Sequence, residues 1–128
     1  MALRSFFTAG TALALSGASS ATILYATSYS GTLTSLNLTQ QANSSHATLE
    51  SIAVTTACSG DTSWLTLDSK TGVLYCLDES WGNPNGTLVA FKTSKTGVLT
   101  QLSKTKTLVG PVSAVVYGNN GSGLAIAE

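Results

Sequence analysis

The sequence repeats itself at an interval of 50 residues. Leu24 and Tyr25 recur as Leu74 and Tyr75, and Leu24 recurs a second time as Leu124. A period of this size is typical of repeat architectures, in which one unit cannot bury its own apolar face and must stack on a neighbour. The repeat therefore limits the chain to folds that are built from stacked, similar units.

Turn signals divide each period into two halves. The hexapeptide "SKTGVL" begins at Ser69 and again at Ser94, and each copy places a glycine, Gly72 or Gly97, just before an apolar run. Glycine at such a position adopts a positive φ without steric cost and closes a hairpin. A half period thus holds one hairpin, and a full period holds four antiparallel strands, which is the blade of a β-propeller.

Short runs of alternating apolar and polar residues, punctuated by Gly, Asn, Asp and Ser, predict an all-β fold without helices. One complete four-stranded blade is expected at 63–105. Residues 22–55 supply the three outer strands of the preceding blade, and 112–127 supply the first two strands of the next. The nine expected antiparallel strands are 22–28, 31–38, 48–55, 63–68, 73–78, 86–93, 97–105, 112–117 and 123–127.

Residues 1–21 have the pattern of a secretory signal peptide. Arg4 supplies positive charge, "FFTAGTALAL" supplies a short apolar stretch, and "SGASSA" supplies small residues for cleavage after Ala18 or Ala21. The alternative is a membrane anchor, but the apolar run is shorter than the roughly 20 residues of a spanning helix. We therefore expect a secreted, extracellular protein with no membrane span after cleavage.

If the protein is secreted, the two cysteines are expected to form a disulfide, and the glycosylation motifs become candidate glycan acceptors. An oxidising compartment allows Cys58 and Cys76 to pair, and a loop of this length gives a stabilisation of about 3 kcal/mol. Four triplets match the N-glycosylation pattern and lie in or beside predicted turns, so the chain is expected to be a glycoprotein. The four acceptors are Asn37, Asn43, Asn85 and Asn120.

Composition excludes some classes of partner. Only 9% of residues are charged, the formal net charge is zero, and no run of Lys or Arg forms a phosphate-binding stripe. Nucleic acid is therefore not an expected partner. With 43% hydrophobic residues, the chain is also not a charged disordered tail.

The segments "SWLTLDSKTGVLYCLDE", "NGTLVAF", "GPVSAVVYG" and "GSGLAIA" resemble the opening blades of the lactonase seven-bladed β-propeller family. The similarity is to its secreted fungal branch, related to carboxy-cis,cis-muconate lactonising enzyme and to phosphogluconolactonase, and it covers 22–127. The resemblance implies a small-molecule lactone or carboxylic acid as substrate. Family members act through His, Arg and Glu side chains in later blades, so no catalytic residue is assigned to this chain.

Seven blades of this period would need about 350 residues. The chain is therefore expected to be the N-terminal fragment of a lactonase or cycloisomerase, and to fold poorly and lack activity when expressed alone. The alternative is a small secreted β-rich glycoprotein that binds a ligand, such as a carbohydrate, without catalysis. Further 50-residue repeats encoded downstream would favour the first hypothesis, and a genuine stop codon after Glu128 would favour the second.

Few residues of the chain are candidates for chemistry, and no cofactor or metal site is expected. His46 lies in a polar link and is interpreted as a solvated loop histidine. Asp68 and the pair Asp78-Glu79 lack the spacing of a calcium loop and are interpreted as turn caps. The "GNNGSG" segment at Gly118 lacks the lysine of a phosphate loop and is interpreted as a hairpin turn.

The two tryptophans have different expected roles. Trp64 falls in the expected innermost strand of the complete blade, where a large ring fills the gap between stacked sheets. Trp81 is flanked by small and polar residues in a loop and is the better candidate for an exposed contact with a sugar or an aromatic acid, or else for an anchor of its loop.

Overall fold

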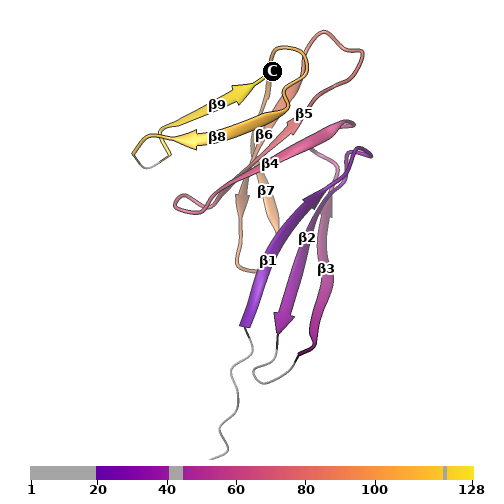
Figure 1. Ribbon diagram of the computed structural model, residues 1–128, viewed down its shortest axis with the longest axis vertical. Helices are drawn as coiled ribbons and strands as arrows, with labels where there is room; N and C mark the ends of the chain where they lie inside the picture. Colours follow the sequence, from indigo (N-terminus) through magenta and orange to yellow (C-terminus); the bar gives the residue numbers. More distant parts are fainter. Residues whose placement is uncertain (1–19, 41–44, 120) are drawn as a thin grey trace, which may run out of the picture.

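The computed structural model describes residues 20–40, 45–119 and 121–128, which form nine strands in three antiparallel sheets (Figure 1). This arrangement confirms the predicted all-β class and the grouping of strands by three, four and two. The first sheet contains β1 (Ser20–Thr27), β2 (Leu33–Gln40) and β3 (Ala47–Thr55). The second contains β4 (Thr62–Asp68), β5 (Val73–Asp78), β6 (Thr87–Thr93) and β7 (Leu99–Lys106), and the third contains β8 (Ser113–Tyr117) and β9 (Gly123–Ala127).

Strand ends differ from the predicted ends by no more than two residues. The turn before β2 explains one difference, because the amide of Gly31 donates to the Ser28 carbonyl oxygen at 3.0 Å with a φ of 78°. That turn delays the start of β2 to Leu33. At the other end of the sheet, β1 begins at Ser20, inside the segment that the sequence assigns to a signal peptide.

The repeat of the sequence is also a repeat of strand register. Tyr25 lies opposite Ser35, and Tyr75 lies opposite Ala90. Beside Ser35 and beside Ala90, the pairing with the outer strand shifts by one residue, as in a β-bulge. The extra residues are Ile52 in β3 and Leu102 in β7, which again lie one period apart in the sequence.

Strand β4 joins the three sheets, because it contacts both β1 and β8 (Figure 1). The carbonyl oxygen of Ala114 in β8 accepts a hydrogen bond from the Trp64 indole at 3.2 Å and another from the Thr66 hydroxyl at 2.7 Å. Trp64 thus connects neighbouring blades through a hydrogen bond, but the residue is 42% exposed, so it fills the predicted gap between the sheets only in part.

The hydrophobic core lies between the first and second sheets. Leu33 faces it from β2, and partly buried Tyr25 packs against it from β1. The second sheet contributes its central strands, and each fully buried apolar side chain of this kind contributes about 1.5–3 kcal/mol to folding. The buried members of this core are Leu33, Cys58, Leu74, Cys76, Val89 and Phe91.

Gly97 shows how closely the two sheets approach each other. It lies in the turn between β6 and β7 with a φ of 79°, and a Cβ atom at this position would overlap the Cδ1 atom of Ile52. The extra residue of the bulge in β3 therefore packs on a glycine of the next blade. A side chain at this position would force the end of the Ile52 side chain to move.

We expect Gly97→Ala to destabilise the chain more than Gly82→Ala. Both glycines have a positive φ, but no atom lies within 4 Å of a Cβ atom at Gly82, so the difference isolates the steric clash. Overpacking a core costs about 1–3 kcal/mol, and we expect a value at or below the lower end of this range, because Ile52 is 38% exposed and can move the end of its side chain aside. The free energy of unfolding in urea measures the difference, and Ile52→Ala in the Gly97→Ala background should recover part of it. Equal losses for the two glycine variants would contradict the packing of Ile52 on Gly97.

Candidate functional site

Loops from the first two sheets meet at one end of the structure. The turn between β1 and β2 carries Tyr29, the segment before β4 carries Asp61, and the loop after β5 carries Glu79 and Trp81. Hydrogen bonds connect all three segments. We refer to Tyr29, Asp61, Asp78, Glu79 and Trp81 as the loop cluster.

Glu79 is the centre of the loop cluster. Its side chain is only 7% exposed, and its carboxylate accepts hydrogen bonds from the Tyr29 hydroxyl at 3.3 Å and from the Trp81 indole at 2.6 Å. The negative charge of Glu79 raises the pKa of Tyr29, because it disfavours the tyrosinate anion. Tyr29 and Glu79 lie 50 residues apart, so equivalent loops of successive blades make this contact.

The two aspartates of the loop cluster organise its backbone. Asp78 accepts hydrogen bonds from the amides of Asp61 at 2.9 Å and Ser80 at 3.0 Å, and from the Ser80 hydroxyl at 2.7 Å. The Asp61 carboxylate accepts a hydrogen bond from the Trp81 amide at 2.9 Å. Asp78 is therefore a turn cap, as predicted, whereas Glu79 joins two blades and does not cap a turn.

Asp68 caps the hairpin between β4 and β5, which confirms the prediction for this residue. Its carboxylate accepts hydrogen bonds from the Lys70 amide at 3.0 Å and from the Thr71 hydroxyl. The hydrogen bond from Thr71 lowers the pKa of Asp68. The stabilisation that this ionised cap provides is present above the pKa of an unfolded aspartate and is lost as the pH falls through the lowered pKa.

Trp81 borders a cavity of about 310 Å³ at the edge of the loop cluster. Its ring is 73% exposed, which agrees with the prediction of an exposed contact, and its two hydrogen bonds also anchor the loop. Binding sites for small molecules begin at about this volume and are mostly apolar. The cavity is lined by Glu79, Trp81, Gly82, Val109, Gly110 and Val112.

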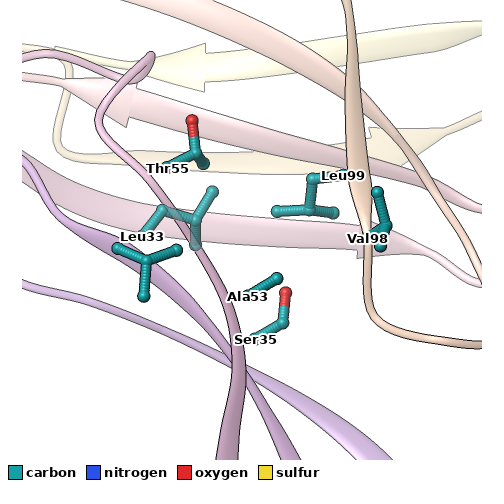
Figure 2. Close-up of a pocket in the computed structure, with 7 residues that line it drawn as sticks. Leu33, Ser35, Ala53, Thr55, Val98 and Leu99 are labelled. Atoms are coloured by element: carbon teal, nitrogen blue, oxygen red, sulfur yellow. The ribbon is translucent and has the colours of Figure 1, made fainter.

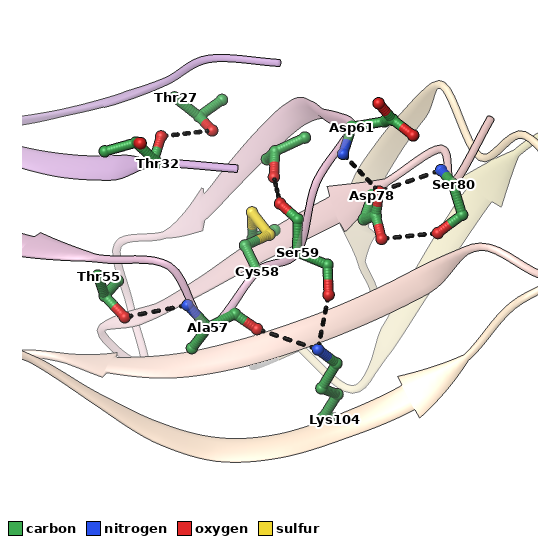
Figure 3. Close-up of a disulfide and its surroundings, with 12 residues drawn as sticks. Thr27, Thr32, Thr55, Ala57, Cys58, Ser59, Asp61, Asp78, Ser80 and Lys104 are labelled. Atoms are coloured by element: carbon green, nitrogen blue, oxygen red, sulfur yellow. Dashed lines mark hydrogen bonds between the residues drawn. A yellow bond between two sulfur atoms is a disulfide. The ribbon is translucent and has the colours of Figure 1, made fainter. Parts of the chain in front are cut away.

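The predicted disulfide between Cys58 and Cys76 is present, with Cα atoms 6.1 Å apart (Figure 3). Cys76 lies opposite Leu65 in the register of β4 and β5. Next to the bridge, the Lys104 ammonium group donates to the Ala57 carbonyl oxygen at 3.2 Å and to the Ser59 hydroxyl at 2.8 Å. The disulfide and Lys104 therefore hold the segment that leads from the first blade into the second.

The predicted glycosylation sites have different structural settings. Asn85 lies in the loop between β5 and β6, as expected. Asn37 does not lie beside a turn, because β2 continues to Gln40, and its half-buried side chain donates to the Thr39 hydroxyl at 3.3 Å. Asn43 and Asn120 lie outside the described residues.

His46 and the glycine-rich segment are remote from the loop cluster. His46 is exposed just before β3, at the opposite end of β2 from Tyr29. An eight-residue strand spans roughly 25 Å, so the imidazole cannot reach Glu79. The segment at Gly118 connects β8 to β9, as the hairpin interpretation predicts.

The chemistry that this end of the molecule can perform is limited. The carboxylate of Glu79 is already hydrogen-bonded to a phenol and an indole, which holds the Trp81 ring in place. In the described parts of the chain, no group of three or more His, Cys, Asp or Glu side chains is arranged to hold a metal ion. Within the same residues, no helix is long and apolar enough to cross a membrane.

The grouping of the strands indicates a fragment of a β-propeller, and comparison with known protein families shows which family it belongs to. The family described as "Lactonase, 7-bladed beta-propeller" matches residues 22–128. The chain belongs to this family. Its three sheets are accordingly one lactonase propeller blade and parts of two others, and the family implies a small-molecule substrate for the complete propeller. No curated protein and no solved structure matches the chain.

Sequence reasoning missed two members of the loop cluster, Tyr29 and Asp61. For Tyr29, the offset of 50 residues from Glu79 was an available signal. No pattern in the sequence indicated that the Asp61 carboxylate accepts a hydrogen bond from the Trp81 amide, because this contact depends on how two loops fold back on each other.

We expect Glu79→Gln to lower the pKa of Tyr29 toward the ordinary value of about 10, because the variant removes the negative charge beside the phenol. Absorbance-monitored alkaline titration of the four tyrosines measures this change. Glu50→Gln, on the exposed strand β3, is the matched control and should leave the titration unchanged. A shift that persists in a Tyr29→Phe background would show that another tyrosine responds to Glu79.

Proposed function

We propose that residues 22–128 form the first blades of a secreted lactonase or cycloisomerase. The complete enzyme would open the ring of a small-molecule lactone, or form such a ring from a carboxylic acid. The family match over this range is the observation that carries the proposal. The four-stranded sheet β4–β7, with partial sheets on both sides, supports it. In this proposal, the chain contributes structure to the propeller, and the catalytic residues belong to later blades.

The loop cluster supports the proposal that this chain contributes structure and that later blades contribute the catalytic residues. Lactone chemistry needs a proton donor and acceptor, together with cationic or hydrogen-bonding groups for the developing negative charge. Glu79 is largely buried and bonded to Tyr29 and Trp81, and the one histidine lies at the other end of the first sheet. These side chains organise the ends of two blades and do not assemble a catalytic group.

A binding module without catalysis is the second candidate function. The exposed ring of Trp81 beside a largely apolar cavity is the observation that favours it. The Trp81 indole is held by its hydrogen bond to Glu79, and its backbone amide is held by Asp61, so the ring can stack on a neutral sugar at little cost in conformational entropy. If the chain is such a binding module, Trp81→Ala removes sugar binding, and the chain binds the sugar without later blades.

We expect the chain, expressed alone from a secreting host, to show no lactone hydrolysis and to associate into oligomers. The exposed side chains of Val109, Val115 and Tyr117 leave an apolar surface on and beside the third sheet, and such surfaces promote association. Size-exclusion chromatography and a lactone hydrolysis assay measure the two properties. A polypeptide extended by further 50-residue repeats is the comparison and should be monomeric and active. A monomer of the short chain that hydrolyses a lactone would contradict the proposal.

We also infer that the chain is secreted, with residues 1–21 acting as a signal peptide and Asn85 as a glycan acceptor. Cleavage after Ala18 leaves β1 complete, whereas cleavage after Ala21 removes its first two residues, so the first position is favoured by strand pairing. The buried disulfide supports an oxidising compartment.

Asn85→Gln should remove one glycan from the secreted chain, and Asn37→Gln should change the glycan content less. Asn85 lies in a loop, whereas Asn37 lies inside the middle strand of a sheet, where a glycan would displace its contact with Thr39. Mass spectrometry before and after enzymatic deglycosylation measures occupancy, and sequencing of the mature N-terminus locates the cleavage site. Retention of the chain in the cell with an intact N-terminus would contradict the proposed secretion.

A further inference from the structure

The first sheet has a free edge along β1. Strand β1 stands at the end of the strand order β1-β2-β3, so within the described residues it pairs with β2 alone. The second sheet covers one face of the first sheet, where Figure 2 shows Ser35 and Ala53 facing Leu99 across a cavity of about 120 Å³. Strand β4 contacts β1 but does not pair with it. The amide and carbonyl groups on the outer side of β1 therefore have no partner strand.

The free edge of β1 is suited to bind a strand of another molecule. The sequence of β1, SATILYAT, contains no proline and no charged residue. Its pairing with β2 is regular from Ser20 to Thr27, so the edge is straight. Figure 1 shows that the first residues of β1 project beyond the second sheet, where another strand can approach them. Long, straight and uncharged edges of this kind form backbone hydrogen bonds with strands of other chains.

The other two sheets show which side chains fit opposite β1. In the second sheet, Leu74 occupies the position of Leu24 in the repeat, and Leu67 of β4 lies opposite it. In the third sheet, Leu124 occupies this position, and Val116 of β8 lies opposite it. A strand that pairs with β1 should therefore place an aliphatic side chain opposite Leu24.

A second copy of β1 meets this requirement. When two identical antiparallel strands are related by a two-fold axis through Leu24, the two Leu24 side chains lie opposite each other. Ile23 of each copy then lies opposite Tyr25 of the other, and pairs of β-branched and aromatic side chains stabilise antiparallel strands. Thr22 lies opposite Ala26. Because β1 has no charged side chain, no like charges meet across the axis.

We propose that two copies of this chain dimerise through β1 and join their first sheets into one antiparallel sheet of six strands. The strand order of this sheet is β3-β2-β1-β1-β2-β3, and the interface is isologous, with the same surface contributed by both copies. The central pairs, from Thr22 to Ala26, are retained whether the signal peptide is cleaved after Ala18 or after Ala21. The proposal goes beyond the proposed function, because it uses neither the loop cluster nor the exposed third sheet.

Leu24→Lys tests the proposal, with Leu49→Lys as the matched control. Both leucines are exposed on the same face of the first sheet, but Leu49 lies in β3, two strands away from the free edge. A Val115→Lys background places a charge on the exposed third sheet in all samples and suppresses association there. Leu24→Lys places two ammonium groups opposite each other and should weaken dimerisation about 10-fold, whereas Leu49→Lys should leave it unchanged. Analytical ultracentrifugation measures the dissociation constants.

Hydrogen exchange of the wild-type chain distinguishes pairing along the edge of β1 from association through a face. The β1 amides that point away from β2 should exchange slowly above the dissociation constant and rapidly below it. Association through the third sheet leaves the exchange of these amides independent of concentration. Circular dichroism and the closed disulfide monitor folding, and the exchange measurement decides the question if Leu24→Lys loses its sheet signal.

Three results would overturn the proposal. The first is a chain that remains monomeric, and the second is a chain that associates while exchange of the β1 amides does not depend on concentration. The third is an equal loss of dimerisation in Leu24→Lys and Leu49→Lys. Protection of the β1 amides in a monomer belongs to the first result and would assign the edge to a segment of the same chain. Lactone hydrolysis does not enter the test, so this proposal and the proposed function can fail separately.

Discussion

The whole fold depends on one constraint, which is that a sheet of three or four short strands has two faces and can bury neither of them alone. The contact between β1–β3 and β4–β7 satisfies this need for one face of each sheet, and the core lies there. Stability in this chain is therefore a property of interfaces between units, as in other repeat proteins. A substitution such as one at Leu33 acts on two blades at once.

The segment between β3 and β4 receives more cross-links than its length suggests. The disulfide fixes Cys58 to β5, Lys104 reaches from β7 to the backbone at Ala57, and Asp61 binds the loop of Trp81. This segment is the covalent connection between two blades, and rigid attachment at three places determines how one blade is oriented to the next. The geometry of the loop cluster follows from this attachment, because Tyr29 and Glu79 belong to different blades.

Much of the architecture could be predicted because it repeats. Alternating residues and glycine turns identified all nine strands, and the two cysteines indicated the disulfide that joins Cys58 to Cys76. Features that depend on the packing of one blade on another were not predicted. The buried carboxylate of Glu79 and the cavity of about 120 Å³ between the first two sheets belong to this class, because local sequence patterns do not report contacts between sheets.

The bulge that recurs at Ile52 and Leu102 affects the perimeter of the molecule. In each case the extra residue lies in β3 or β7, the outermost strand of its sheet. A bulge bends a strand and increases its twist, so the free edge of that strand no longer presents a straight row of amide and carbonyl groups. Such an edge is a poor template for a strand of another molecule. Ile52, which packs on Gly97 of the next blade, therefore also makes the outer edge of its own sheet a poor site for strand addition.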